Sequence, residues 1–490
     1  MMYPRLKLAR NLLADHGAIM VHMDENEHSN LEKLLNEVFG EENNLGTIVW
    51  DKRNPKGDST GVSQQHELIC VYCRDREAFK RSGEFLRSKE NAERMLLKAS
   101  QIVGREGGVT EKARREYREW VKQQDLSGGE AAYNQIDAQG DVFRPVSMAW
   151  PNKKRAPDDY FVPLIHPISK RPCPVPERGW RNPSETMQEL LKAGQILFGA
   201  DEATQPTRKY LLKDNLFENV PSLLYFGGSD DALLAEMGIP FDTPKPVYVT
   251  KRLVQSACRG DGIVLDFFAG SGTTGHATMS QNAADGGSRR YILVQIPEPL
   301  DIEDTDQKVP ANFCDQLGKP RNISELTKER LRRAASKVKA DNPEWTGDAG
   351  FRVYKLDQSN IRAWQPSGDI EQDLLDNVEH IVPDRSEQDV LTELLLKLGL
   401  DLCVPIEQRQ IAGKTVHAIG AGVLMACLDP RIGKEDAEPL ALGMAGWHKE
   451  LDPAGDTTCV FRDSAFENDE AKTNLAAILE QHGIRNVRSL

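Results

Sequence analysis

Residues 263–274 constrain the fold of this chain more than any other stretch. An apolar run ends in Asp266, and a turn that contains Gly270 and Gly272 follows at once, before residues that read as a helix start. A strand, a tight glycine turn and a helix form a nucleotide-type cofactor site at the carboxyl end of a parallel strand. We therefore expect an α/β fold with a ligand site in this turn.

The spacing of the turn, Asp-x-Phe-x-Gly-x-Gly, indicates which ligand it suits. It is neither Gly-x-Gly-x-x-Gly nor a phosphate loop, and no lysine follows that could clamp a triphosphate. The glycines let backbone approach a ligand, and Thr273 and Thr274 are expected to cap the following helix. A ligand with an amino-acid end and an adenosine end fits best. The alternative is an ordinary glycine-rich βα turn.

Length and charge set wider limits. The chain has 490 residues, enough for two to four domains, and a net charge of −13, which argues against a generally basic nucleic-acid binder. A local basic groove would still collect phosphates. No apolar run reaches the roughly 18 residues that span a membrane. Eight cysteines, with Cys70 and Cys73 as the only close pair, favour the cytoplasm and no metal site.

Residues 1–74 have the pattern of half a doubly wound α/β domain. The order is helix, strand, helix, strand, strand, and the loop between the last two strands carries Lys52 and Arg53. Asp24 and Glu25 follow the first strand. They either line the ligand pocket or are acids at a helix start.

Residues 75–240 interrupt this pattern, so we interpret them as an inserted domain. Trp150 lies just before a basic cluster of Lys153, Lys154 and Arg155. The cluster is either a solvated turn or a phosphate contact, with Trp150 as a stacking surface for a base.

Residues 241–365 return to α/β. Lys245 and Pro246 precede a helix, the glycine turn follows, and a strand over 290–295 comes next. The group that holds a ribose should lie near the end of that strand, which favours Gln295 over Glu298. A further strand is expected over 350–356. Residues 366–490 are predicted to form a separate C-terminal α/β domain for subunit assembly.

The glycine turn resembles motif I of amino-methylating DNA methyltransferases that use S-adenosylmethionine. The order of parts is similar to the β-permuted class, and the ordered set resembles the modification subunit of type III restriction–modification systems. The segments that carry the likeness are residues 66–72, 151–154, 174–181, 244–246, 294–299 and 350–353.

The resemblance implies roles for particular residues. The methionine end of the cofactor would contact five residues of the turn, with Lys245 and Pro246 beside it. Residues 75–240 would recognise double-stranded DNA. A restriction subunit and a second modification subunit would be the protein partners. The five turn residues are Asp266, Phe268, Gly270, Gly272 and Thr273.

The reaction implied is methyl transfer to N6 of adenine in a base flipped out of the duplex. The family uses an Asp-Pro-Pro-aromatic motif for it, and these 490 residues contain none; Asn342-Pro343-Glu344-Trp345 has one proline and lies on the wrong side of the turn. No catalytic residue is therefore assigned. The motif would precede Met1, and its strand would lie between the strand at 263–266 and the strand at 18–23.

Two other functions are compatible with the sequence. A non-catalytic DNA-recognition or assembly subunit would bind the cofactor without turnover. A dinucleotide oxidoreductase fits less well, because Gly-x-Gly-x-x-Gly is absent and Gln295 replaces the usual ribose-binding acid.

The sequence predicts that residues 1–490 alone methylate no DNA and fold poorly unless another polypeptide supplies the missing strand, because open strand edges invite wrong pairing. An assay with tritiated S-adenosylmethionine and duplex DNA checks this. Robust labelling of DNA by the purified chain would refute it.

Overall fold

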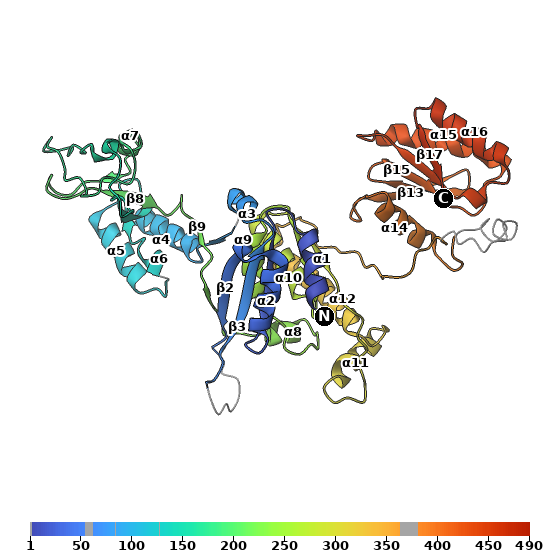
Figure 1. Cartoon of the computed structure of the whole chain (residues 1–490), viewed down its shortest axis with the longest axis horizontal. Coiled ribbons are helices and arrows are strands. Elements are labelled where there is room, and N and C mark those ends of the chain that lie inside the picture. The colour runs from blue at the N-terminus through green and yellow to red at the C-terminus, as the bar shows by residue number, and fades with distance from the viewer. Residues whose placement is uncertain (1, 54–61, 84, 127, 363–380) are drawn as a thin grey trace. The chain divides into compact units, whose positions relative to one another are not determined.

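The computed structural model describes residues 2–53, 62–83, 85–126, 128–362 and 381–490 (Figure 1). They form two compact units, Met1–Gly350 and Phe351–Leu490, both of mixed α/β structure. No helix among these residues is long and apolar enough to cross a membrane.

The first unit contains a four-stranded sheet in the order β1-β3-β2-β10. Both β1 and β2 run antiparallel to β3, whereas β10 is parallel to β2. The predicted helix–strand–helix–strand–strand order of residues 1–74 is confirmed. The strands are β1 (Ala18–Met23), β2 (Asn44–Asp51), β3 (His66–Cys73) and β10 (Leu223–Tyr225).

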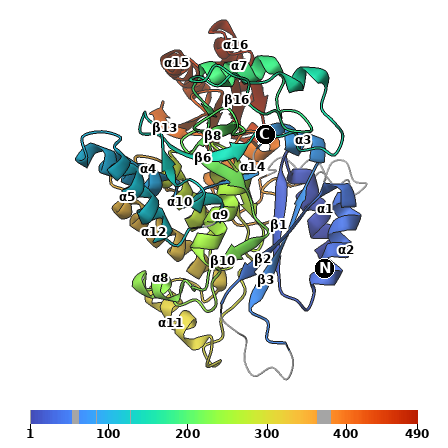
Figure 2. The same cartoon turned by 90° about the vertical axis from the view of Figure 1, so that its left-hand side faces the viewer.

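Helices cover both faces of this sheet (Figure 2). Successive side chains of a strand point to opposite faces, so Cys70 and Tyr72 pack with the first two helices, while Ile69 and Val71 pack with α9. Buried on both sides, β3 reads as a nearly continuous apolar run. The helices are α1 (Met2–Leu12), α2 (His28–Phe39) and α9 (Val247–Ala257).

A second, two-stranded sheet carries the glycine turn. β11 (Ile263–Asp266) and β12 (Arg290–Leu293) are parallel, and α10 (Thr273–Asp285) connects them. Within the described residues β11 pairs only with β12, and β1 only with β3. A single doubly wound sheet thus stays a prediction. The nearby helices are α8 (Asp231–Glu236), α11 (Lys308–Gln316) and α12 (Ile323–Asp341).

The inserted segment contains its own four-stranded sheet, in the order β5-β6-β8-β7, and a core under α4 and α5. The division into domains at residues 75, 241 and 366 stays a prediction. β10 belongs to the segment predicted as the insertion, yet it pairs with β2 of the first segment. The elements from 76 to 219 are α3 (Arg76–Ser82), β4 (Leu86–Ser88), α4 (Ala92–Arg105), α5 (Glu111–Lys122), α6 (Gly128–Ala131), β5 (Gln135–Ile136), β6 (Val142–Ser147), α7 (Ser184–Lys192), β7 (Ile196–Leu197), β8 (Thr207–Leu211) and β9 (Phe217–Asn219).

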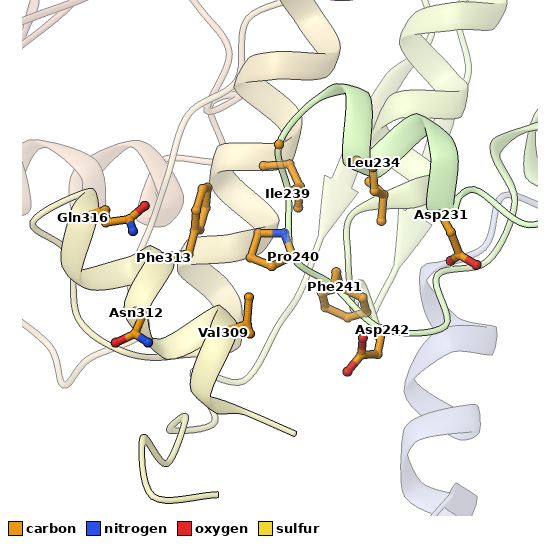
Figure 3. A pocket seen from close by; sticks show the side chains of 12 residues that line it. Asp231, Leu234, Ile239, Pro240, Phe241, Asp242, Val309, Asn312, Phe313 and Gln316 are labelled. Carbon is orange, nitrogen blue, oxygen red and sulfur yellow. The ribbon is translucent and has the colours of Figure 1, made fainter. Parts of the chain in front are cut away.

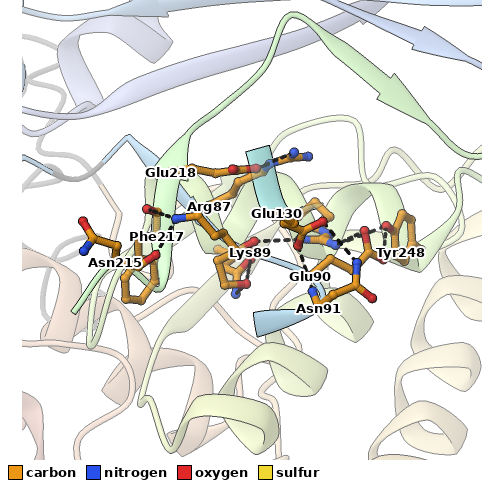
Figure 4. A network of polar contacts seen from close by, with 12 residues as sticks. Arg87, Lys89, Glu90, Asn91, Glu130, Asn215, Phe217, Glu218 and Tyr248 are labelled. Atoms are coloured by element: carbon orange, nitrogen blue, oxygen red, sulfur yellow. Dashed lines mark hydrogen bonds and ion pairs between the residues drawn. The ribbon is translucent and has the colours of Figure 1, made fainter. Parts of the chain in front are cut away.

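The two chain segments that enter and leave the insertion are tied together at its base (Figure 4). β4 and β9 pair antiparallel, and Lys89 donates to the Phe217 carbonyl over 2.8 Å. Glu90 accepts from the Tyr248 hydroxyl of α9 at 3.0 Å and pairs with Arg252 at 2.9 Å. These contacts fix the insertion to the helix that follows Lys245.

The second unit is a five-stranded mixed sheet in the order β13-β14-β15-β16-β17 with helices packed on it. The strand predicted over 350–356 is wrong: these residues pair with no strand, and Arg352 instead donates to the carbonyl of Val404 at 3.0 Å. The elements are α14 (Glu387–Lys397), β13 (Ile406–Ile411), β14 (Lys414–Ile419), β15 (Leu424–Cys427), α15 (Lys434–Leu451), β16 (Thr458–Phe461), α16 (Asp469–Gln481) and β17 (Asn486–Ser489).

His276 makes the stability of the first unit dependent on pH. It lies on α10 with 4% of its surface exposed, and burial, helped by Arg330, lowers its pKa from 6.5 to about 3. Between pH 6.5 and pH 3, His276 is therefore protonated in the unfolded chain and neutral in the folded chain. Its contribution to stability is complete above pH 6.5 and declines as the pH falls toward 3.

Replacing His276 by Gln should weaken this dependence. We expect acidification from pH 7 to pH 5 to lower the unfolding free energy by about 2 kcal/mol more in the wild type than in His276→Gln. Urea unfolding at both pH values measures it, with exposed His16→Gln as control. Equal pH dependence in His276→Gln and wild type would contradict the assignment.

Candidate cofactor-binding site

The turn between β11 and α10 is held in a left-handed conformation by its glycines. Gly270 has φ 52° and Gly272 has φ 84°, values that strain any residue with a Cβ. A Cβ on Gly272 would also lie 3.1 Å from Cγ2 of Thr327 in α12. Asp266 holds the other side of the turn, accepting from the Phe268 amide at 3.0 Å. Ser271, Gly272 and Thr273 are buried, so a ligand can approach the turn at Phe268 and Gly270.

The two threonines after the turn do not cap the helix, contrary to the sequence prediction. The N-cap residue of α10 is Gly272, so both threonines lie within the first helical turn. Their hydroxyls tie the turn to other segments instead. Thr273 donates to the Lys245 carbonyl at 3.0 Å, and Thr274 donates to the Asp266 carboxylate at 2.6 Å.

The hydrogen bond of Thr273 brings two sets of predicted cofactor residues together. Lys245 and Pro246 immediately precede α9, and the Thr273 bond places their turn against the first turn of α10. Phe268, at the start of the glycine turn, is 56% exposed. Residues from two segments, 20 or more positions apart, therefore border one region at the carboxyl end of β11.

Gln295, predicted to hold the ribose, contacts the same turn. Its side-chain oxygen accepts from the Gly270 amide at 2.7 Å, two residues beyond the end of β12. Glu298 is exposed, and its carbonyl accepts from the Ile323 amide at 3.0 Å. Of the two candidates, only Gln295 has a side chain bonded to the turn. The ribose role stays a prediction.

Asp24 and Glu25 follow β1 directly. The Asp24 carboxylate accepts from the backbone and side-chain nitrogens of Asn26, at 3.2 and 3.1 Å. This local turn is compatible with either role considered for the two acids, and the choice between them stays open.

A buried carboxylate that the sequence did not reveal joins the sheet to this site. Glu67 on β3 accepts from Lys245 at 2.5 Å and from Lys52 at 2.9 Å. Burial alone would raise its pKa, but the two lysines outweigh burial and hold the pKa below its usual value. Both ammonium groups also lie within 6 Å of the Trp50 ring, at 5.8 and 5.4 Å. Glu67 thereby links a predicted cofactor residue to a predicted DNA-binding residue.

His22 on β1 lies beside this cluster, edge-on to the Trp50 ring with centroids 6.3 Å apart. Burial, followed by the charge of Lys245, lowers its pKa to about 4. The imidazole is therefore neutral at physiological pH. No spacing in the sequence marks His22 or Glu67, because their neighbours come from distant segments of the chain.

The residues predicted to contact DNA lie in two places. Arg53, next to Lys52, stacks its guanidinium over the Tyr225 ring at 5.6 Å. In the inserted segment Lys153 and Lys154 are exposed, whereas Arg155 pairs with Asp158 and lies over the Phe161 ring. The DNA roles stay predictions.

Trp150 is half-buried, with its ring edge-on to Tyr160 at 5.2 Å. This contact covers part of the ring. The stacking role predicted for Trp150 stays a prediction and would use the part of the ring that Tyr160 leaves open.

A cavity of about 650 Å³ lies between α8, α11 and the segment after α8 (Figure 3). Apolar side chains such as Leu234, Phe241 and Phe313 line most of it. None of the predicted cofactor residues lines this cavity. We propose the site at the glycine turn, because left-handed glycines and convergent polar groups occur there, whereas the cavity is a gap between helices.

Comparison with known proteins identifies the family of the chain. Residues 1–298 match a family described as DNA methylase (N6_N4_Mtase), which is more than half of the chain. The chain therefore belongs to the DNA methylase family, and the family implies a methyl donor as cofactor. The matched part includes the turn before α9, the glycine turn and β12.

Curated relatives are of the same kind. The chain is 32% identical to the Mod subunit of the type III restriction-modification enzyme EcoP15I of Escherichia coli, over 85% of this chain and 61% of the relative. It is 31% identical to the StyLTI Mod subunit of Salmonella typhimurium, over 72% and 48%. It is 26% identical to the type II methyltransferase M.KpnI of Klebsiella pneumoniae, over 67% and 72%. The chain spans about half to six-tenths of the two Mod subunits.

Removing the charge of Glu67 should destabilise the cluster that Glu67 forms with Lys52 and Lys245. We expect Glu67→Gln to lower the free energy of unfolding by about 1–2 kcal/mol, because two lysines then lose a partner that is 10% exposed. Thermal unfolding measures it. Glu77→Gln is the matched control, since Glu77 pairs with Lys80 at the surface. Equal effects of the two substitutions would contradict a special role for Glu67.

Proposed function

We propose that this chain is the modification subunit of a type III restriction–modification system, which transfers a methyl group from S-adenosylmethionine to N6 of adenine in double-stranded DNA. The observation that carries the proposal is the Thr273–Lys245 hydrogen bond, because it joins the glycine turn to the segment before α9. The match to the DNA methylase family and the names of the relatives support it.

The residues at the turn fit the methionine end of the cofactor. A carboxylate is favoured at the N-terminus of a helix such as α10, where backbone amides lack partners, and the Lys245 ammonium adds positive charge. Asp266 uses each oxygen once within the turn, which leaves further lone pairs for an ammonium group. Gly270 leaves room for the ligand, while Gly272 lets the turn pack against α12.

The cofactor would supply a methyl group activated by a sulfonium. The chain's own residues would bind and orient it: Phe268 provides an apolar surface at the exposed side of the turn, and Gln295 lies where the ribose hydroxyls are expected. The buried cluster around Glu67 would hold Lys245 in place from the sheet side.

DNA contact would come from cations outside the turn. Lys52 and Arg53 follow β2, and Glu67 links Lys52 to the proposed cofactor residue Lys245. The other cations, Lys153, Lys154 and Arg155, lie in the insertion. We propose that the insertion recognises the sequence while Trp150 stacks on a base. A restriction subunit and a second modification subunit would complete the enzyme in the cytoplasm, where its DNA substrate lies.

Calorimetry with S-adenosylmethionine and the full chain tests the function. We expect Gly272→Ala to raise the dissociation constant at least about tenfold, because φ 84° and the Thr327 contact both oppose a Cβ. Gly286→Ala is the matched control at the other end of α10, with φ 70° and open space around it.

The control should lose some stability through its φ of 70° and keep its affinity. Equal affinities of Gly272→Ala and wild type would contradict the location of the site. Absence of heat with the wild type would contradict the function itself.

A further inference from the structure

Arg330 of α12 is a buried arginine directly behind the glycine turn. It has 0% of its surface exposed. One terminal nitrogen donates to the Ser271 hydroxyl and, at 2.7 Å, to the Thr273 hydroxyl. The other lies 3.5 Å from the Asp230 carboxylate. A full positive charge is thus placed against the turn by hydroxyl groups and a single distant carboxylate.

The same network reaches the segment before α9. The Thr273 hydroxyl, which accepts from Arg330, donates to the Lys245 carbonyl. Asp230, at the N-cap of α8, accepts from the Val247 amide at 2.8 Å. Arg330 therefore bridges three chain segments: the turn at 271–273, the turn at 245–247 and the start of α8.

Neighbours of Arg330 on α12 supply the packing. Thr327 donates to the Gly270 carbonyl at 2.6 Å, and Leu331 fills the space beside Gly272 and Gly275. Since these residues already cover the turn, a guanidinium adds little apolar contact. Burying it costs free energy unless its hydrogen bonds compensate, and Nε has no partner in the described part of the chain. Burial lowers the Arg330 pKa to about 10, so it stays charged at neutral pH.

We propose that Arg330 is the positioning residue of the cofactor site, which fixes the glycine turn relative to Lys245. This inference rests on the proposed function. The planar fork of arginine suits the task, because one end reaches two hydroxyls while the other faces a carboxylate. A lysine offers a single point charge and cannot span these partners.

Arg330→Ala with chemical rescue tests the proposal. We expect the dissociation constant for S-adenosylmethionine to rise at least about tenfold, or about 1.4 kcal/mol, and to recover when guanidinium is added, but not when sodium is added at equal ionic strength. Arg332→Ala is the control on the same helix, because Arg332 pairs with Glu329 at the surface. A purely structural role predicts no rescue of affinity by a free ion.

Ser271→Ala is a milder variant in case Arg330→Ala does not fold. It removes one acceptor of the guanidinium and should weaken binding about threefold, with a melting temperature within about 2 °C of wild type. Unchanged affinity in Ser271→Ala, or no rescue of Arg330→Ala by guanidinium, would overturn the proposal.

Hydrogen exchange separates this inference from the proposed function. Without any ligand, deuterium uptake by a peptide covering 269–274 should be faster in both variants than in wild type. If the wild type binds no cofactor, the function fails, and exchange still decides the positioning role. Unchanged exchange at the turn would overturn the role of Arg330.

Discussion

The site depends on the contact between the left-handed backbone at Gly272 and helix α12. The turn reverses direction at φ 84°, which strains any residue with a Cβ, and a Cβ there would lie 3.1 Å from Thr327. Thr327 packs against the turn and donates a hydrogen bond to the Gly270 carbonyl. A helix that follows the cofactor segment by about fifty residues therefore sets the shape of the turn.

Polar contacts assemble the site from segments far apart in the sequence. The Thr273 hydroxyl reaches the turn before α9, and Glu67 on β3 pairs with Lys245, 178 positions away. The contacts between Glu90 and α9 extend the chain of interactions to the inserted segment. A shift of α9 would therefore disturb contacts both at the glycine turn and at the base of the insertion. The proposed function requires such an arrangement, because it would bring the cofactor and a recognised DNA base together.

Local patterns were enough to predict the elements around the site. The apolar run before Asp266 and the glycines after it predicted a strand, a turn and a helix. The place of Lys245 beside them came from the family resemblance and not from a local pattern. The threonines were misjudged because a capping residue and a first-turn residue look alike in sequence, and the actual cap is Gly272. The strand expected at 350–356 was wrong because its alternating apolar residues pair with no strand among the described residues. Glu67 and Arg330 could not be found, since their partners are set by tertiary packing and leave no spacing signal.

Photochemical cross-linking tests the central claim most directly. The claim is that the turn at 266–273, held by α12 and by the segment at 245, is where the methyl donor binds. Ultraviolet irradiation of the full chain with radiolabelled S-adenosylmethionine, followed by peptide mapping, should place the label in peptides that cover 241–246 or 263–298. Label confined to the second unit, or spread evenly over the chain, would contradict the account.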